Sequence, residues 1–236
     1  MICNNMENNN TYTMRVIARL HGGYASKFGV PRQSGLTDEV VSRIVFEKPY
    51  RDENALRGIE GYSHLWLVWY FHEFPHTDGE WSPTVRPPRL GGNTRMGVFA
   101  TRSPNRPNPI GLSSVRLVGV EKTANEGTVL LVSGADLTDG TPILDIKPYL
   151  AFTDAHTDAV GGFADRVKGK ALEVRFADDT SSVFEGEVRD ALVSMLSQDP
   201  RPSYQNDPER VYGMRFEGHD VHFCVDGSAL TVLRIE

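Results

Sequence analysis

The sequence predicts a mainly β fold, with an N-terminal β-barrel followed by a small α+β C-terminal domain. Between Met14 and Leu150 the chain holds six or seven strand-like segments and almost no helical pattern. These segments are short and separated by turn residues, which is typical of barrels and closed antiparallel sheets. Beyond residue 170 the pattern changes to one helix among four short strands, which indicates a separate α+β unit.

Hydrophobic pattern and turn residues define the elements of the barrel. Val40–Phe46 is rich in β-branched and aromatic residues, and Ser63–Phe71 is nearly continuously apolar, which predicts a fully buried strand. Asp52–Arg57 predicts a short helix that ends at Gly58. Asp139-Gly140 predicts a turn between two strands. The other strands predicted here are Met14–Leu20, Gly97–Ala100, Ile110–Glu121, Thr128–Gly134 and Pro142–Leu150.

The second unit contains the one long helix that the sequence predicts. Ser181 or Ser182 can cap this helix, which runs to about Gln198. Its apolar residues at helical spacing are Phe184, Val188, Leu192 and Met195. The strands predicted around it are Ala171–Phe176, Val211–Glu217, Val221–Val225 and Leu230–Ile235, the last two joined by a turn at Asp226-Gly227. The chain thus divides into an Asn-rich disordered tail (1–13), the barrel (14–155), a polar linker (156–170) and the α+β domain (171–236).

Composition is that of an ordinary globular protein, with 39% hydrophobic and 24% charged residues. The two cysteines, Cys3 and Cys224, do not suggest a disulfide framework and fit a reducing cytosol. No apolar run reaches the roughly 18 residues of a membrane span. The first residues lack the pattern of a secretory signal. We therefore expect a cytoplasmic protein that does not enter a membrane.

Positive charge is concentrated in one window. The forty residues from Trp81 to Val120 contain six arginines and no Asp, Glu or Lys, whereas the whole chain has a net charge of −6. The window therefore carries +6 and the remaining 196 residues carry −12. Arginine presents a planar fork that suits phosphate or carboxylate, and the prolines and glycines of this window stiffen the backbone or allow close approach. The window predicts an anion-binding loop; the alternative is a solvated loop with scattered surface ion pairs.

One apparent metal motif does not predict a metal site. His72-Glu73-Phe74-Pro75-His76 matches H-E-x-x-H, which binds zinc only on a helix, where both histidines share one face. Pro75 disfavours a helix at this position. We expect a strand end that leads into a loop, with His72 and Glu73 at a rim or with His72 as a structural histidine. A hydrolase that uses this segment remains an alternative.

Three longer motifs resemble a known family. RPPRLGGNTRMGVFATRSPNRPNPIGLS (Arg86–Ser114), preceded by PRQSG and followed by DLTDGTPILDIKPY (Asp136–Tyr149), resembles the TsaA-like family, which includes the TrmO tRNA methyltransferases. DPRPSY (Asp199–Tyr204) is similar to a segment of its full-length bacterial members. The resemblance covers nearly the whole chain from Met14. Neither a P-loop nor a Rossmann fingerprint is present in the sequence.

The resemblance implies both a fold and an activity. Members of the family bind S-adenosylmethionine in an all-β barrel instead of a Rossmann domain, and they form homodimers. They methylate the N6 nitrogen of N6-threonylcarbamoyladenosine, adjacent to the tRNA anticodon on its 3′ side. We therefore expect a tRNA methyltransferase that recognises the anticodon loop. Carried over by position, the cofactor contacts are Arg32, Gln33, Ser34, His72, Glu73, Arg102, Leu112, Ser133, Gly134, Ala135 and Asp136.

The chemistry of this reaction agrees with the residues present. Methyl transfer from a sulfonium is an in-line displacement that needs no metal and depends on positioning. The accepting nitrogen is ureido-like and weakly basic, so a base that removes its proton would help. Candidate bases are Asp136, Asp139 and Asp145, although Asp also favours turns. Tyr149 and Lys147 could orient the base, and we select Asp136, Asp145 and Tyr149 as the catalytic residues.

The arginines have two predicted roles. Arg102 is expected to bind the carboxylate or the adenine of the cofactor. The others are expected to hold the anticodon-loop backbone, where unpaired bases are also open to stacking. The predicted tRNA contacts are Arg86, Arg89, Arg95, Arg106, Arg201 and Tyr204. For the last two, a proline-stiffened turn is the alternative. At the level of the whole protein, the alternatives are a non-catalytic RNA-binding barrel and a methyltransferase of another anionic substrate.

Overall fold

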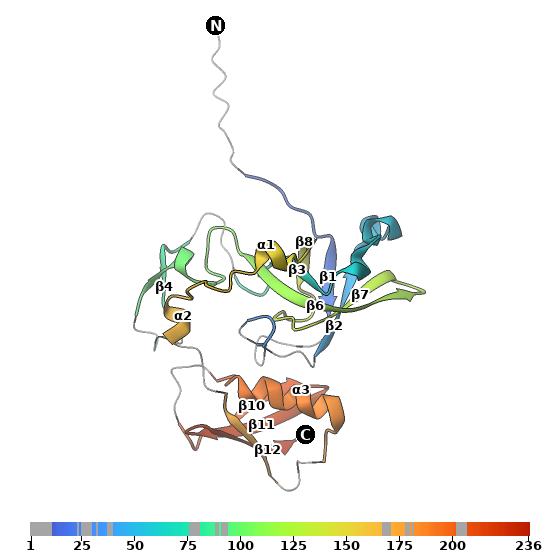
Figure 1. The fold of residues 1–236 in the computed structure, drawn as a ribbon. Coiled ribbons are helices and arrows are strands. Elements are labelled where there is room, and N and C mark those ends of the chain that lie inside the picture. Colours follow the sequence, from blue (N-terminus) through green and yellow to red (C-terminus); the bar gives the residue numbers. More distant parts are fainter. Residues whose placement is uncertain are drawn as a thin grey trace.

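Antiparallel strands build the first domain, as the computed structural model in Figure 1 shows. In the part of the chain that the structure describes, six strands run in the order β1-β2-β7-β6-β3-β8, and β1 pairs with both β2 and β8, so the sheet closes into a barrel. The predicted mainly β fold is confirmed. The strands are β1 (Ala18–His21), β2 (Val41–Phe46), β3 (His64–Tyr70), β6 (Ile110–Thr123), β7 (Gly127–Ser133) and β8 (Pro142–Pro148).

The structure describes residues 11–22, 24, 30, 31, 33–36, 40–75, 81–87, 90, 94–166, 171–177, 180, 182–201 and 207–236. Most of the predicted N-terminal tail therefore lies outside the described residues. None of the helices within these ranges combines the length and the apolar character that a membrane crossing requires.

Strand β3 shows how the barrel is filled. Leu65, Leu67 and Trp69 point inward and are buried, whereas Trp66 and Val68 lie between them on the outer surface and are partly exposed. The prediction of a fully buried strand is therefore wrong for one face, because successive side chains of a barrel strand alternate between interior and exterior. The barrel core also contains Ala18, Leu20, Ile44, Phe46, Val115, Leu130, Val132 and Ile143.

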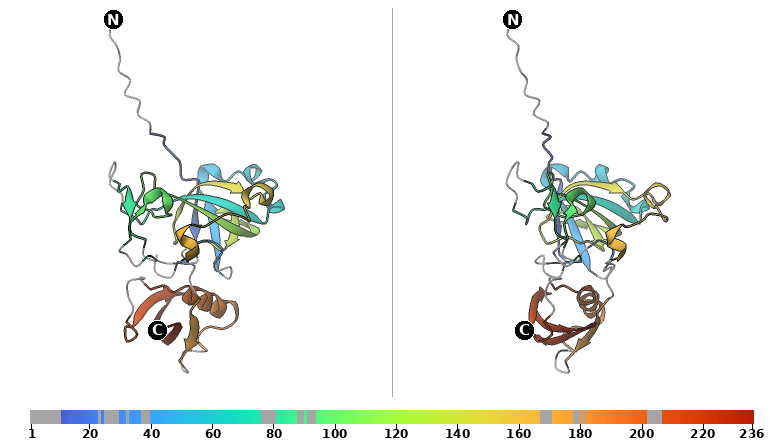
Figure 2. Two further views of the ribbon diagram at one scale, coloured as in Figure 1. Left: turned by 60° about the vertical axis from the view of Figure 1, so that its left-hand side comes forward. Right: turned by 90° about the vertical axis from the view of Figure 1, so that its left-hand side faces the viewer.

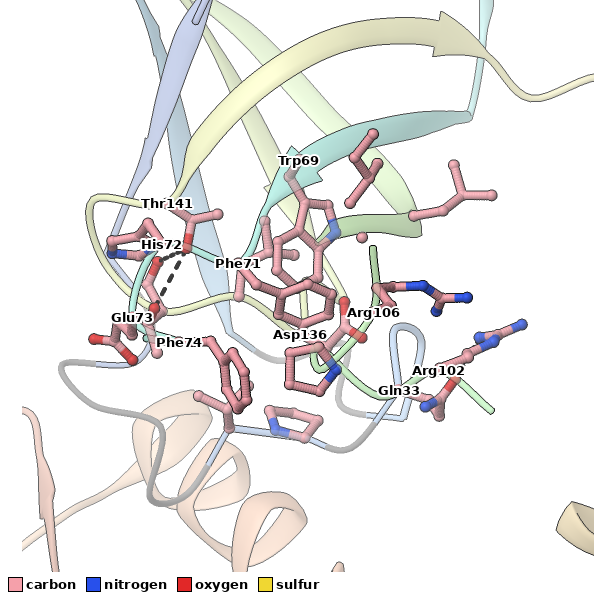
Figure 3. Close-up of a pocket in the computed structure, with 18 of the residues that line it drawn as sticks. Gln33, Trp69, Phe71, His72, Glu73, Phe74, Arg102, Arg106, Asp136 and Thr141 are labelled. Atoms are coloured by element: carbon pink, nitrogen blue, oxygen red, sulfur yellow. Dashed lines mark hydrogen bonds between the residues drawn. The ribbon is translucent and has the colours of Figure 1, made fainter. Parts of the chain in front are cut away.

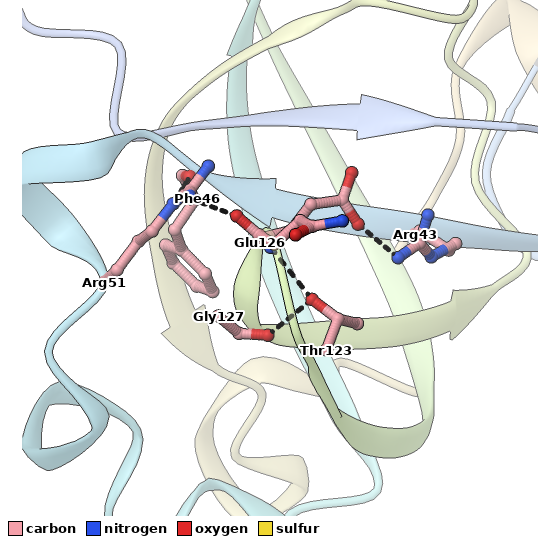
Figure 4. A network of polar contacts seen from close by, with 7 residues as sticks. Arg43, Phe46, Arg51, Thr123, Glu126 and Gly127 are labelled. Atoms are coloured by element: carbon pink, nitrogen blue, oxygen red, sulfur yellow. Dashed lines mark hydrogen bonds and ion pairs between the residues drawn. The ribbon is translucent and has the colours of Figure 1, made fainter.

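A hydrogen-bonded turn closes the hairpin of β6 and β7 (Figure 4). The Thr123 hydroxyl donates to the Gly127 carbonyl at 2.9 Å and accepts from the Glu126 amide at 3.1 Å. Gly127 has a φ of +76°, which glycine adopts at little cost. Arg51 follows β2 in the chain and donates to the Asn125 carbonyl at 3.0 Å. The hairpin is thus fixed against the segment after β2. It lies at the end of the barrel that contains the first residues of β3.

The arginine-rich window forms a lobe beside the barrel, and we call residues 81–87, 90 and 94–106 the arginine lobe. Strand β4 (Thr84–Val85) pairs with β5 (Met96–Gly97), and η5 (Val98–Ala100) is a 3-10 helix. The predicted strand Gly97–Ala100 is therefore wrong beyond its first residue, because the chain turns inward there to bury Val98.

The other short elements are single turns. The helix predicted at Asp52–Arg57 is a 3-10 helix, η2 (Glu53–Leu56), capped by the Asp52 carboxylate, and a left-handed Gly58 follows. The polar linker contains one short helix that was not predicted, α2 (Phe163–Arg166). The remaining short elements are η1 (Lys48–Tyr50), η3 (Ile59–Gly61) and α1 (Ala151–Asp154).

The second domain is an α+β unit, as predicted. Among its described residues, four strands run in the order β10-β11-β12-β9, with β9 parallel to β12, and α3 (Gly186–Ser197) lies beside them (Figure 1). The helix begins several residues after the predicted caps, with no side-chain cap, so Phe184 is buried before the helix instead of within it. The strands are β9 (Glu173–Phe176), β10 (Tyr212–Phe216), β11 (His219–Asp226) and β12 (Ala229–Ile235).

The loop after β1 connects the two domains, which lie one below the other in both views of Figure 2. Tyr24 is only 3% exposed and belongs to the core of the second domain, and Val30 and Val40 pack against the same core. The backbone of Tyr24 also forms a bridge with Thr138, and its carbonyl accepts from the Asp139 amide at 2.8 Å. The second domain is therefore anchored beside the turn that leads into β8.

Replacing Tyr24 by Ala should destabilise the second domain, because it removes a buried aromatic ring from that core. Truncation of a buried aromatic side chain to Ala costs about 3–5 kcal/mol. Urea denaturation of the full chain measures this loss. Tyr12→Ala is the matched control, since Tyr12 is 91% exposed and its truncation should change stability little. Equal stabilities of the two variants would show that Tyr24 does not anchor the second domain.

Candidate functional site

A cavity of about 470 Å³ opens at the barrel end where β3 finishes and β6 begins. Its volume lies within the usual range of small-molecule sites. Aromatic, aliphatic and proline side chains form most of its wall. In the view of Figure 3, Arg102 and Gln33 lie on one side of the cavity, His72 and Glu73 lie on the other, and Asp136 lies between them.

The back wall of the cavity depends on a close contact between β3 and β6. Trp69 points inward from β3, and its register partner on β6 is Gly111. A β-carbon on Gly111 would lie 2.2 Å from the Trp69 ring, a distance that real contacts do not reach. Glycine at this position therefore makes room for the indole to lie flat against the backbone of β6. Phe71 continues the aromatic wall, with its ring centroid 4.2 Å from that of Trp69.

A chain of polar groups runs from this indole to a carboxylate. Ser113 lies two residues after Gly111, so it faces the same interior and is fully buried. Its hydroxyl accepts from Trp69 Nε1 at 2.9 Å and donates to Asp136 Oδ1. Because each group has a partner, the Asp136 carboxylate is held in one orientation at the cavity wall.

Burial raises the pKa of Asp136 above its ordinary value of 3.8, because a charged carboxylate is poorly solvated there. The Ser113 hydroxyl, the positive charge of Arg102 and the Ser34 amide act in the opposite direction, but the effect of burial is larger. Asp136 is therefore a more basic carboxylate than one in open water.

The loop that contains Gln33 and Ser34 docks onto the same region. The Gly35 amide donates to the Gly134 carbonyl at 2.9 Å, and the Ser34 hydroxyl accepts from the Ser114 amide at 3.3 Å. The Gln33 side-chain oxygen accepts a hydrogen bond from the Arg102 guanidinium. Three segments that are distant in sequence therefore meet at one end of the barrel.

The predicted cofactor residues converge on this cavity. Ser133, Gly134 and Ala135 are buried and form the end of β7 and the turn that carries Asp136 into the wall. Ser34 binds the backbone of β6, as described above. Arg32 lies outside the described residues. The predicted cofactor residues that line the cavity are Gln33, His72, Glu73, Arg102, Leu112 and Asp136.

The segment that resembles a zinc motif forms turns. The His72 amide donates to the Tyr70 carbonyl at 2.8 Å, and the Phe74 amide donates to the Phe71 carbonyl at 3.3 Å. The predicted strand end followed by a loop is confirmed, and both His72 and Glu73 are exposed at the rim. Within the described part of the chain, no three His, Cys, Asp or Glu residues are placed to hold a metal ion.

Two predicted catalytic residues lie away from the cavity. Asp145 is on β8, where Lys147 pairs with its carboxylate at 2.8 Å, and both side chains are about half exposed or more. Tyr149 packs its ring beside Trp66, with centroids 5.4 Å apart. Neither residue is in the described lining of the cavity, whereas the third candidate, Asp136, is.

The arginines predicted to bind tRNA lie in different environments. Arg106 lines the cavity, and Arg86 and Arg95 are exposed on the arginine lobe. Arg201 instead is 8% exposed and forms two bonds to the Asp199 carboxylate, at 2.8 and 3.0 Å. The prediction that Arg201 extends the positive surface is corrected to a structural role, because its guanidinium stabilises the turn after α3. Arg89 and Tyr204 lie outside the described residues.

Sequence reasoning missed the groups that support Asp136. The sequence predicts Trp69 only as a strand residue, and Gly111 and Ser113 only as members of a strand and of the motif Arg86–Ser114. One signal was available: Gly111 and Ser113 are small residues at successive inward positions of one strand, which indicates that something large or polar occupies the space opposite them. Their partners depend on the pairing register of β3 with β6, which the sequence does not contain.

Comparison with known proteins gives the same family over both domains. Residues 19–155 match the model described as tRNA-methyltransferase O N-terminal domain, and residues 170–236 match the TrmO C-terminal domain. The tRNA (adenine(37)-N6)-methyltransferase of Escherichia coli (strain K12) is 39% identical over 235 residues, covering 96% of this chain and 98% of that protein. The putative S-adenosylmethionine-dependent methyltransferase RcsF of Pseudomonas aeruginosa is 40% identical over 220 residues, covering 90% and 92%.

A solved structure agrees with these matches. The crystal structure of TrmO from Pseudomonas aeruginosa superposes with a TM-score of 0.75 at 32% identity, covering 96% of this chain and 99% of that chain. Both domains are therefore shared in sequence and in fold.

Replacing Gly111 by Ala should force Trp69 out of its place, because the new β-carbon would overlap the indole ring. Overpacking of this kind typically costs about 1–3 kcal/mol of unfolding free energy, which urea denaturation measures. Gly119→Ala is the matched control on the same strand, since a β-carbon there meets no atom within 4 Å. If both variants unfold at the same urea concentration, the contact does not constrain the barrel.

Replacing Asp136 by Asn should stabilise the protein at neutral pH. A carboxylate whose folded-state pKa is raised favours folding below its ordinary pKa of 3.8 and loses that contribution as the pH rises through the folded-state value. The amide keeps an acceptor for Ser113 without a buried charge. Melting temperatures are measured between acid and neutral pH. That of Asp136→Asn should exceed that of the parent protein near neutrality, and the difference should vanish in acid.

Asp158→Asn serves as the control for this comparison, because Asp158 is exposed and its neutralisation should leave the melting curve almost unchanged at every pH. An Asp136→Asn variant that is less stable than the parent at neutral pH would mean that Ser113 and Arg102 outweigh burial.

Proposed function

Because the chain belongs to the tRNA-methyltransferase O (TrmO) family, we propose that it transfers the methyl group of S-adenosylmethionine to N6 of adenosine 37 in tRNA, in its threonylcarbamoyl form. The chain is an enzyme, a tRNA adenine N6-methyltransferase. One observation carries the proposed site: a basic carboxylate, Asp136, is fixed by Ser113 and Trp69 in the wall of a cavity that also contains Arg102.

The residues that line the cavity fit S-adenosylmethionine. Trp69, Phe71 and Phe74 offer aromatic surface for an adenine ring, and Arg102 offers a charged fork for a carboxylate. The carboxylates of Asp136 and Glu73 suit its cationic groups. When bound, the cofactor supplies a methyl group that is activated for in-line displacement without a metal.

Asp136 is the residue that we propose as proton acceptor. The accepting nitrogen carries a carbonyl substituent, so it is a poor nucleophile until its proton leaves. Burial makes Asp136 more basic than an exposed carboxylate, and the hydroxyl of Ser113 prevents it from turning away. Asp145 is paired with Lys147 and Tyr149 is packed beside Trp66, so the geometry favours Asp136 among the three predicted catalytic residues.

We further propose that the anticodon loop lies across the mouth of the cavity. The exposed Arg86 and Arg95 would neutralise phosphates of its backbone, while Arg106 lies closer to the cofactor. The acidic remainder of the chain, with a net charge of −12 outside the arginine-rich window, would repel RNA elsewhere and so orient it.

A cytoplasmic homodimer is the assembly that the family resemblance supports. Val118 leaves apolar surface exposed on the outer face of β6, as an interface between subunits would use. We also propose that the barrel domain spans residues 14–155, that a linker spans 156–170 and that the second domain spans 171–236.

Incubation with labelled S-adenosylmethionine and bulk tRNA tests the function directly. The tRNA is prepared from cells with and without the threonylcarbamoyl modification. We expect label only in the modified tRNA, with the methyl group on N6 of adenosine 37 after digestion to nucleosides. Calorimetry with the cofactor alone is the control for binding.

Each other outcome has a distinct meaning. Measurable cofactor binding without label in either tRNA would move the methyl acceptor to another anionic substrate. A chain that binds tRNA but no cofactor would instead be an RNA-binding barrel.

A further inference from the structure

Two aromatic side chains of the arginine lobe are exposed and face each other. Trp81 is 46% exposed and Phe99 is 73% exposed, with ring centroids 5.9 Å apart and ring planes inclined by 33°. Apolar surface in water is unfavourable by roughly 25 cal/mol per Å² relative to buried surface. The pair therefore forms an aromatic surface that a partner could cover with a gain in free energy.

The lobe holds this pair on a fixed frame. The Val98 amide donates to the Pro83 carbonyl at 3.0 Å, which joins the segment after Trp81 to the turn that carries Phe99. Val98 itself is buried, and the Thr101 hydroxyl donates to its carbonyl at 2.9 Å. Each aromatic residue is thus within two residues of an anchored position, so little conformational freedom would be lost on binding.

The same frame connects the aromatic pair to the rim of the cavity. Arg106 lines the cavity and donates to the Thr101 carbonyl at 3.3 Å. Arg102 also lines the cavity and follows Phe99 by three residues, so their Cα atoms are at most about 11 Å apart. The aromatic surface is therefore close enough for one small loop of nucleic acid to contact both.

Exposed arginines lie on the same lobe as the pair. Arg86 and Arg95 are exposed on the segments of β4 and β5, and Arg95 is oriented by a 3.1 Å hydrogen bond from its Nη1 to Thr84 Oγ1. Arg102 is exposed on the side of the cavity. Rings interleaved with arginines are the usual surface for single-stranded nucleic acid, where bases stack and phosphates are neutralised.

We propose that Trp81 and Phe99 form a stacking platform for an unpaired base of the tRNA anticodon loop, beside the base that enters the cavity. This proposal rests on the methyltransferase function given above. Anticodon-loop bases are unpaired and accessible for stacking. A platform that holds a neighbouring base would keep the loop open while the target adenosine is inserted and read.

A second copy of this chain is the other partner that could cover Trp81 and Phe99. The core of a protein–protein interface is depleted of charged residues. Here six arginines and no acidic residue lie between Trp81 and Val120, which favours a polyanion over an apolar partner surface. The charge around the rings therefore selects RNA.

Steady-state kinetics on three variants tests the platform. Trp81→Ala/Phe99→Ala should raise the KM for modified tRNA about tenfold to a hundredfold, as expected when base stacking of about 1–3 kcal/mol is lost. Its affinity for S-adenosylmethionine, measured by calorimetry, should stay unchanged. Trp81→Phe keeps an aromatic ring and should retain tRNA affinity within about threefold, since any ring can stack on a base.

Tyr62→Ala is the matched surface control. Tyr62 is 40% exposed and lies two residues before the start of β3, at the end of that strand opposite to the cavity, so its truncation should leave the KM for tRNA unchanged. Circular dichroism verifies folding, and Phe99→Ala alone replaces the double variant if the latter does not fold.

Tryptophan fluorescence gives a direct reading of stacking. An anticodon stem-loop RNA should quench the emission of the parent protein, and Trp81→Phe should lose most of this quenching. The remaining tryptophans, Trp66 and Trp69, line the cavity, so their response to a base that enters it is the quenching that persists in Trp81→Phe, and only the quenching that is lost reports on Trp81.

The possible failures are distinguishable. If the parent methylates tRNA but the double variant keeps the parental KM, the platform is wrong and the function stands. If the parent transfers no methyl group, the proposed function fails, and the fluorescence experiment still decides whether the rings contact RNA. A change from dimer to monomer in light scattering, with unaltered RNA affinity, would assign the pair to a subunit interface and overturn the platform.

Discussion

The candidate site depends on one close contact, the indole of Trp69 lying against the backbone of Gly111. A barrel interior of this size is normally filled by side chains from every strand. Here the missing side chain at Gly111 leaves space that a single large ring occupies. The ring then brings its N–H to Ser113, and Ser113 brings its hydroxyl to Asp136. The absence of a side chain at Gly111 therefore fixes the orientation of the Asp136 carboxylate at the barrel end, through Trp69 and Ser113.

The electrostatics of Asp136 follow from the loops that close over it. Asp136 follows the end of β7, and the Ser34 amide lies beside its carboxylate and favours the charged form. Burial disfavours the charged form, whereas Arg102 and nearby donors favour it. Val30 lines the cavity and packs against the core of the second domain, to which Tyr24 also belongs. The second domain therefore supports the cavity without contributing its central carboxylate.

Strands were predictable from sequence because short segments rich in β-branched and aromatic residues lie between turn residues, as in the wall of a barrel. The same reasoning failed where tertiary contacts decide. α3 begins at Gly186, whose φ is +54°, and Phe184 is buried before the helix begins. Gln33, Arg102 and Asp136, which the motif resemblance selects as cofactor contacts, line one cavity. The resemblance could not show that Ser113 faces inward and Ser114 outward, because that depends on the pairing register of β6.

The arginines illustrate the same limit and give the site its asymmetry. All of them count as equal positive charges in the sequence, yet the structure places those that it describes in three physical situations. Arg201 is buried against Asp199, so its charge is already neutralised and adds little to any external field. Arg102 and Arg106 bond to Gln33 and to the Thr101 carbonyl at the cavity, so their charge acts over short range on whatever the cavity holds. Arg86 and Arg95 remain exposed on the lobe, where a polyanion can reach them. In the function that we propose, the arginines at the cavity act on the carboxylate and the bound cofactor, whereas Arg86 and Arg95 contact the RNA, so one window of sequence serves both purposes.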